Sequence, residues 1–325
     1  MFKEEKLVLT QDWDKIFPRN EKVNHKKITF HNHFGITLAA DMYWPKDAKG
    51  KLPAIACSGP YSAVKEQVSG LYAQELASRG FLTIAFDPSF YGESGGYPRY
   101  MNAPDINVED FQAAVDFLSN LEEVDENKIS ILGICGWGGF ALQTACVETR
   151  IKSCICVTMY DMARVASKGY HDVQTSEERL KMLEEVNDLR TKEYGRDDFY
   201  CPGGQPSSYP DDAPQFLKDY AAFYGKGNRG YHPRSLGSNQ GFAVQTMTSL
   251  LADKLFEYAG DIKTPVLLVH GEKAHSRFFS EDAFKLLKGD NKELYIVPNA
   301  VHCDLYDNLE KIPFNYIEGF VRKSL

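Results

Sequence analysis

Short apolar segments alternate with helical patterns along most of the chain, and this alternation limits the folds that it can adopt. Segments with the length and composition of buried strands lie at residues 53–57, 81–86, 129–134, 151–157, 265–269 and 294–297. Helical patterns lie between the earlier segments, at residues 68–79, 108–121 and 138–147. This order indicates a mostly parallel sheet with helices on both faces, and a hairpin at residues 26–44 is predicted to precede it.

A different pattern occupies residues 162–245, where predicted helices at 176–194 and 214–224 flank a segment rich in Pro, Gly and Tyr. We interpret residues 1–161 and 246–325 as an α/β core, and residues 162–245 as a mostly helical cap inserted over the carboxyl ends of the strands. Long insertions at that edge often act as lids. The alternative is a surface excursion without ligand contact, in which aromatic residues such as Tyr220 and Tyr224 form only the cap's own core.

Composition narrows the range of partners. The formal net charge of −8 opposes binding to nucleic acid and to anionic membranes. The seven cysteines lack metal-ligand spacing, so we expect reduced thiols, no metal and a cytoplasmic protein. No apolar run is long enough to span a bilayer, and the charged residues 1–10 do not resemble a signal peptide. These features favour a small-molecule substrate and leave the oligomeric state, a homodimer included, open.

The residues that follow the predicted strand 129–134 carry the strongest functional signal. Cys135 comes directly after the strand, Gly133 precedes it by two positions, and Gly136 opens a glycine-rich start to the next helix. This pattern is typical of a nucleophile elbow, which supports acyl transfer through a covalent intermediate. The helix N-terminus is expected to lower the pKa of the Cys135 thiol. An alternative register places Trp137 at the nucleophile position and leaves the site inactive.

A base that can serve this thiol is predicted at His302, which follows the last predicted strand in the order nucleophile, acid, histidine. Imidazole takes up and returns protons near neutral pH. The orienting carboxylate is predicted at Asp161, at the end of the strand 151–157, with Glu272 as the alternative acid. The usual position for this acid holds Ala274, and Asp161 is equally suited to cap the helix that follows it.

Two backbone amides are needed to bind a developing oxyanion. We predict that Gly136 supplies one and Tyr61 the other, because the neighbouring Pro60 has no N–H group. A plain strand-to-helix turn without this role is the alternative. Arg99 and Trp137 are weaker candidates for contact with substrate, and Arg99 also fits an ordinary surface position.

The elbow Gly133-Ile134-Cys135-Gly136, the His302 loop and the strand order resemble those of the α/β-hydrolase superfamily. The short sequence segments at residues 64–67, 92–99 and 271–277 resemble those of a dienelactone hydrolase-like branch of this superfamily, whose members have a cysteine nucleophile. The resemblance implies an α/β-hydrolase fold with an inserted cap, ester, lactone or thioester substrates, and no cofactor. It also implies a Cys-His-Asp arrangement at Cys135, His302 and an acid that stays open.

The sequence therefore predicts a hydrolase of small carboxylic esters, lactones or thioesters that forms an acyl-Cys135 intermediate. In this hypothesis His302 moves the proton and Asp161 orients the imidazole. An acyltransferase on the same scaffold and a non-catalytic binding protein with a degenerate site are the alternatives. A peptidase is the least favoured reading, because only fold analogy supports it.

Overall fold

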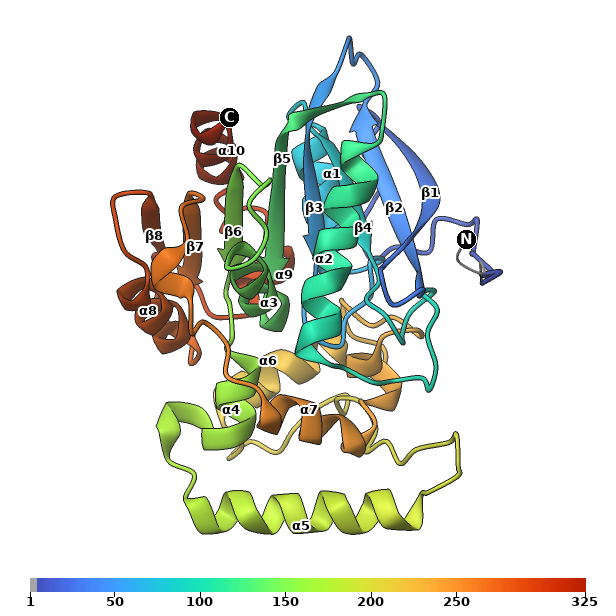
Figure 1. Cartoon of the computed structure of the whole chain (residues 1–325), viewed down its shortest axis with the longest axis vertical. Coiled ribbons are helices and arrows are strands. Elements are labelled where there is room, and N and C mark those ends of the chain that lie inside the picture. Colours follow the sequence, from blue (N-terminus) through green and yellow to red (C-terminus); the bar gives the residue numbers. More distant parts are fainter. Residues whose placement is uncertain (1–4) are drawn as a thin grey trace.

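The computed structural model describes residues 5–325 and contains an eight-stranded sheet (Figure 1). In their order across the sheet, the strands are β1 (Val23–His31), β2 (Thr37–Pro45), β4 (Leu82–Phe86), β3 (Leu52–Ser58), β5 (Val124–Ile134), β6 (Ser153–Val157), β7 (Val266–Gly271) and β8 (Lys292–Val297). β1 and β2 form the predicted hairpin, β2 pairs antiparallel with β4, and the remaining neighbours are parallel. The predicted mostly parallel sheet is therefore confirmed.

Helices cover both faces of the sheet, as the alternation predicted. α2 (Pro104–Ser119) and α3 (Gly136–Ala145) pack on one face, and α1 (Val68–Ala77), α9 (Asp304–Asp307) and α10 (Phe314–Ser324) pack on the other. α8 (Arg277–Leu286) lies beside β7 and β8. Each face thus has its own apolar cluster, and the sheet between them holds the ends of its strands in fixed positions.

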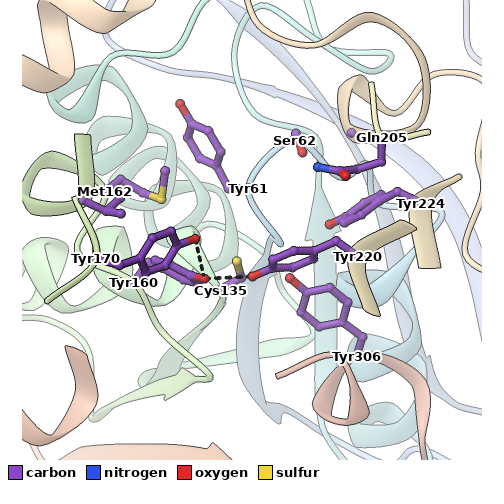
Figure 2. Close-up of a pocket in the computed structure, with 12 residues that line it drawn as sticks. Tyr61, Ser62, Cys135, Tyr160, Met162, Tyr170, Gln205, Tyr220, Tyr224 and Tyr306 are labelled. Carbon is purple, nitrogen blue, oxygen red and sulfur yellow. Dashed lines mark hydrogen bonds between the residues drawn. The ribbon is translucent and has the colours of Figure 1, made fainter. Parts of the chain in front are cut away.

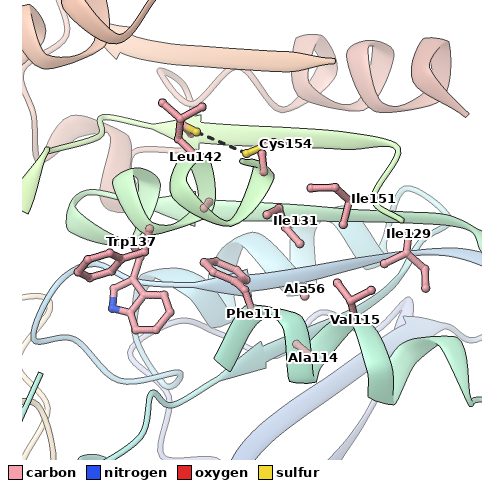
Figure 3. Packing of buried hydrophobic residues seen from close by; sticks show 14 of the residues in the cluster. Ala56, Phe111, Ala114, Val115, Ile129, Ile131, Trp137, Leu142, Ile151 and Cys154 are labelled. Atoms are coloured by element: carbon pink, nitrogen blue, oxygen red, sulfur yellow. Dashed lines mark hydrogen bonds between the residues drawn. The ribbon is translucent and has the colours of Figure 1, made fainter. Parts of the chain in front are cut away.

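The cluster under α2 illustrates why these residues form these elements (Figure 3). α2 begins at Pro104, whose fixed φ suits the first helical position. It buries Phe111 and Val115 one turn apart, on the face that meets the β5 side chains Ile129 and Ile131. The period of the apolar residues therefore decides which side of α2 packs on the sheet.

The chain between β6 and β7 leaves the sheet and lies across the edge at which β3, β5 and β6 end (Figure 1). Its helices are α4 (Met162–Lys168), α5 (Ser176–Lys192), α6 (Gln215–Tyr224) and α7 (Met247–Ala252). α5 lies outermost, and of its residues only Val186 is buried. The division into core and cap at residues 162–245 stays a prediction, and α7 lies beyond that boundary within the same excursion.

Within residues 5–325, no helix combines the length and the apolar character needed to cross a membrane.

Candidate active site

Cys135 occupies a sharp turn between β5 and α3. Its backbone has φ 59 and ψ −128, a conformation that residues other than glycine rarely adopt. Its N–H group donates to the Val157 carbonyl at 2.9 Å, which fixes the turn to the end of β6. A Cβ atom on Gly136 would lie 2.8 Å from the Cβ of Tyr61, so the close approach of these two segments requires glycine. Cys135 therefore stands at the elbow, and the alternative register with Trp137 in this position is wrong.

The Cys135 thiol borders a cavity of about 180 Å³ that both the core and the excursion between β6 and β7 line (Figure 2). The lining residues are Tyr61, Ser62, Cys135, Tyr160, Met162, Val165, Tyr170, Gln205, Tyr220, Tyr224, Gly237 and Tyr306. Tyrosine rings make up much of the wall, and the aromatic residues Tyr220 and Tyr224 of the predicted cap are among them. No Asp, Glu, Lys or Arg occurs among these described lining residues, so the wall is uncharged at neutral pH.

The thiol itself is in a less polar environment than the sequence predicted. Cys135 is only 6% exposed, and burial raises the pKa of its thiol above the usual value. The Tyr306 hydroxyl and the backbone N–H groups of Gly136 and Tyr61 lower this pKa in part, but desolvation is the larger effect. The expectation of a lowered thiol pKa is therefore wrong, because the surrounding wall excludes water, and the resting thiol is neutral at physiological pH.

The two amides that act on the sulfur are those predicted to bind an oxyanion. Gly136 and Tyr61 come from the start of α3 and from the loop after β3, and the N–H groups of both stabilise negative charge at Cys135. A substrate carbonyl carbon bonded to this sulfur would place the carbonyl oxygen near these two N–H groups. The structure brings the three residues together, while the oxyanion role stays a prediction.

His302 is buried next to this group, in the loop between β8 and α9. Its Nε2 atom lies 3.1 Å from the Tyr306 hydroxyl. Burial, together with the nearby His275 and His270, lowers the pKa of His302 well below its usual value. Within the described chain no direct hydrogen bond joins His302 to Cys135, and the Tyr306 hydroxyl approaches both groups.

Hydroxyl groups, and not a carboxylate, orient the His302 ring. The Nδ1 atom of His302 lies 2.6 Å from Ser276 Oγ and 2.8 Å from Thr158 Oγ1. His270 extends this network, with its Nε2 atom 2.9 Å from Ser276 Oγ and its Nδ1 atom 2.7 Å from Ser280 Oγ. Burial lowers the pKa of His270 to about 3, so this chain of groups is uncharged at neutral pH.

The predictions for the orienting acid are corrected accordingly. The Asp161 carboxylate accepts the Arg164 N–H group at 2.9 Å and caps α4, so its oxygens face the helix and not the imidazole. Glu272 accepts the Asn299 N–H group at 2.8 Å, which fixes it at the surface of the loop after β7. Neither carboxylate contacts His302, and the predicted Cys-His-Asp arrangement is wrong in its third member.

Tyr306 and Ser276 were not identified from the sequence, although each had a local signal. Tyr306 follows His302 by one helical turn, so the two side chains share a side of the segment that leads into α9. Ser276 lies two positions after Ala274, in the same loop where an acid was expected. A polar partner from that loop does reach His302, but it is a hydroxyl.

Two weaker predictions of substrate contact are also wrong. Arg99 donates to the carbonyls of Ser94 at 2.5 Å and Gly92 at 3.1 Å, so its guanidinium closes a loop outside the cavity. Trp137 is fully buried among aromatic rings of the core, and its Nε1 donates to the Tyr91 hydroxyl at 3.2 Å (Figure 3). The first turn of α3 points Trp137 toward the sheet, away from the cavity beside Cys135.

A second buried group of ionisable residues lies around Lys65, just after the Tyr61 loop. Its ammonium lies 2.8 Å from Glu66, 2.7 Å from Asp87 and 2.7 Å from Glu93. In residues 5–325 these three carboxylates are the one set whose spacing would suit a metal ion. Because the Lys65 ammonium already lies against all three, we interpret the group as an ion-pair cluster that supports the Tyr61 loop.

The α/β-hydrolase GrgF from Penicillium shares the architecture described above, with a TM-score of 0.73, so the chain has the α/β-hydrolase fold. The family model for the X-Pro dipeptidyl-peptidases (S15 family) matches residues 35–298, and the chain belongs to this family. This membership supports a hydrolase. The narrower resemblance to dienelactone hydrolase-like proteins and the role of cysteine as nucleophile stay predictions.

The chain is similar in sequence to three further proteins. It is 50% identical to the uncharacterized protein PA2218 of Pseudomonas aeruginosa, over 98% of this chain and 86% of that protein. The crystal structure of PA2218 matches with a TM-score of 0.95 over 99% of this chain and 100% of that one. The uncharacterized protein YcjY of Escherichia coli is 31% identical over 87% of this chain and 92% of its own length. A thiohydrolase, aneE of Aspergillus aculeatus, is 32% identical over 42% of each chain.

Proposed function

We propose that the protein hydrolyses small, uncharged thioesters or esters through a covalent acyl-Cys135 intermediate. The observation that carries the proposal is the Cys135 thiol at a strand–helix elbow, open to a cavity and flanked by the Gly136 and Tyr61 amides. The similarity to a fungal thiohydrolase supports a thioester as the substrate. The absence of charged residues from the described cavity wall favours an uncharged acyl group.

The proton of the thiol would reach His302 through the Tyr306 hydroxyl. As the Cys135 sulfur bonds to the substrate carbonyl carbon, its proton passes to the Tyr306 oxygen, and the Tyr306 proton passes to His302 Nε2. The 3.1 Å contact between Tyr306 and His302 supports the second of these transfers. His302 then returns the proton to the leaving thiol or alcohol. Since the resting thiol and imidazole are both neutral, charge develops only during the reaction.

The negative oxygen that forms on the carbonyl carbon would be bound by the Gly136 and Tyr61 N–H groups. Collapse of this intermediate breaks the bond to the leaving group and leaves the acyl group on Cys135. A water molecule then attacks the acyl carbon and gives one proton to His302. This proton passes through the Tyr306 hydroxyl to the Cys135 sulfur as it departs, and the carboxylic acid is released.

The peptidase activity in the family's description is less consistent with this cavity. A dipeptidyl-peptidase acts on a peptide with a free amino terminus, whose ammonium group is usually paired with a carboxylate when it is buried. The described cavity wall contains no carboxylate, and Asp161 is directed away from it. An uncharged acyl substrate is therefore favoured over a peptide.

The test compares the wild-type protein with Cys135→Ala on a panel of N-acetylcysteamine thioesters and p-nitrophenyl esters of short acids. We expect Cys135→Ala to lose at least about 1000-fold in kcat, because it removes the nucleophile. Cys146→Ala is the matched control, since Cys146 lies at the far end of α3. Intact-protein mass spectrometry of the wild-type protein should detect an acyl adduct on Cys135. Undiminished turnover by Cys135→Ala, or no turnover of any ester by the wild type, would contradict the proposal.

A further inference from the structure

His270 is a buried ionisable residue to which the proposed reaction assigns no role. It is the penultimate residue of β7, an otherwise apolar strand, and it is fully buried. A neutral imidazole has one donor nitrogen and one acceptor nitrogen, and a buried ring needs a partner for each. His270 Nδ1 lies 2.7 Å from Ser280 Oγ, and His270 Nε2 lies 2.9 Å from Ser276 Oγ and 3.4 Å from Thr158 Oγ1. Hydroxyl groups therefore hold both nitrogens of the ring.

Two of these hydroxyls also face the catalytic base. His302 Nδ1 lies 2.6 Å from Ser276 Oγ and 2.8 Å from Thr158 Oγ1, so the two hydroxyls stand between the two imidazoles. All four side chains are buried, and the ring centroids of His270 and His302 are 6.1 Å apart. Thr158 has φ 45, a backbone conformation that β-branched residues rarely adopt. Strain of this kind is typical of functional sites, and here it lies where one hydroxyl meets both rings.

The positions of the protons on the two rings are coupled, because each hydroxyl has only one hydrogen to donate. If His302 carries its proton on Nδ1, it donates to the hydroxyl oxygens, and their hydrogens turn to an unprotonated His270 Nε2. If His270 carries its proton on Nε2, the hydroxyls donate to an unprotonated His302 Nδ1, and the proton of His302 is on Nε2. Only the first arrangement leaves His302 Nε2 free to accept the proton of Tyr306, 3.1 Å away.

The other nitrogen of His270 favours the first arrangement. Ser280 lies in α8, one turn after Ser276, and a serine hydroxyl in a helix can donate to the carbonyl group one turn earlier. The Ser280 oxygen is then left to accept from His270 Nδ1, at 2.7 Å. A proton on Nδ1 of His270 leaves its Nε2 unprotonated, and this is the form that receives the hydrogens of the two hydroxyls.

We propose that His270 is a positioning residue that keeps the proton of His302 on Nδ1, acting through the Ser276 and Thr158 hydroxyls. In a Ser-His-Asp triad a carboxylate does this directly, by accepting the Nδ1–H group of the histidine. Here two hydroxyl oxygens accept it, and His270 keeps their hydrogens turned away from His302. The consequence for catalysis rests on the proposed acyl-Cys135 function, whereas the positions of the protons do not.

The test determines these positions by NMR, in proton–nitrogen correlation spectra of the protein with isotope-labelled histidine rings. The signals of the two rings are assigned from their loss in His302→Gln and in His270→Gln. In the wild-type protein both rings should carry the proton on Nδ1. In His270→Leu the two hydroxyls lose their acceptor and can donate to His302 Nδ1, so the proton of His302 should move to Nε2.

Turnover of the preferred thioester gives a second readout. His270→Leu should lose about 100-fold in kcat and keep KM within about threefold, because Nε2 of His302 then carries a proton and cannot accept one. His270→Gln should stay within about tenfold of the wild type, since its side-chain carbonyl oxygen can accept from the hydroxyls. His25→Leu is the matched control and should keep wild-type turnover. His25 lies on β1, 2.7 Å from an oxygen of Asp41, and this carboxylate keeps Lys15 at 2.9 Å.

A wild-type His302 with its proton on Nε2 overturns the proposal. A His302 that keeps its proton on Nδ1 in folded His270→Leu overturns it as well. If His270→Leu does not fold, the wild-type spectrum decides, because protons on Nδ1 of both rings support the proposal and any other pair contradicts it. Undiminished turnover by Cys135→Ala would instead refute the acyl-Cys135 function and leave the spectra as evidence about His270.

Discussion

Replacing Tyr306 by Phe tests the proton path between the thiol and the base. The Tyr306 hydroxyl lies 3.1 Å from His302 Nε2 and also acts on the Cys135 thiol, so its removal breaks the connection at both ends. Positioned acid–base groups contribute about 100- to 10,000-fold to a rate. Because His302 itself stays in place, we expect the lower limit, a loss of about 100-fold in kcat/KM, or about 2.7 kcal/mol of transition-state stabilisation.

The same substitution should cost little of the fold. It leaves His302 Nε2 buried without this partner, which lowers the free energy of unfolding by about 1–3 kcal/mol. A domain with about 5–15 kcal/mol of stability remains folded after such a loss. Tyr91→Phe is the matched control, since it removes another buried hydroxyl, 3.2 Å from Trp137 Nε1 and outside the cavity.

Steady-state kinetics on the preferred thioester, together with urea unfolding, separate the two effects. Tyr306→Phe should lose about 100-fold in kcat/KM, mostly through kcat, while Tyr91→Phe loses comparable stability and stays within about threefold of wild-type turnover. If Tyr306→Phe matches Tyr91→Phe in turnover, the hydroxyl carries no proton and His302 must reach the thiol another way.

Three further predictions concern charge. Because burial raises the pKa of Cys135, its alkylation by iodoacetamide should increase continuously with pH from 7 to 9, and a plateau beginning near neutral pH would indicate a preformed thiolate. Burial lowers the pKa of His275 to about 4 and of His270 to about 3, so at mildly acidic pH the unfolded chain binds more protons than the folded one. In urea unfolding, the contribution of these histidines to stability should be complete above about pH 6.5 and should fall at lower pH by up to about 1.4 kcal/mol per pH unit for each histidine. His270→Gln should reduce this dependence of stability on pH. Lys65→Met should reduce the free energy of unfolding by about 3–5 kcal/mol, because it leaves the buried Asp87 carboxylate without its cation, whereas Glu66 and Glu93 keep Lys27. A loss below about 1 kcal/mol in urea titration would contradict the cluster's role.

The sheet and the elbow were predictable because their causes are local. Each buried strand is a short apolar run, and the neighbouring helix repeats apolar residues at helical spacing. The local pattern of apolar residues therefore predicts the order of strands and helices along the chain. The turn at Cys135 needs Gly136 because the Tyr61 loop approaches so closely, and this glycine is the next residue in the sequence. These features require no knowledge of which distant segments meet.

The site predictions that were wrong depend on contacts between segments that lie far apart in the sequence. Ser276 and Thr158 reach His302 from loops that follow β7 and β6, and hydroxyl residues are too common for their position to stand out in the sequence. The pKa of Cys135 was misjudged because the helix N-terminus is visible in the sequence, whereas the burial supplied by the excursion is not. Trp137 is close to the nucleophile in sequence, but the rotation of α3 turns it into the core.

The ion-pair cluster around Lys65 has a consequence for the smallest unit that can work as an enzyme. The Thr10 N–H group donates to Glu93 at 2.7 Å, and the Lys27 ammonium lies 2.5 Å from the same carboxylate. Both residues precede residue 35, where the match to the shared family region begins. A fragment limited to that region would leave Glu93 with fewer partners and would destabilise the ion-pair cluster beside the Tyr61 loop. The segment before residue 35 is therefore part of the same folded domain as the candidate active site.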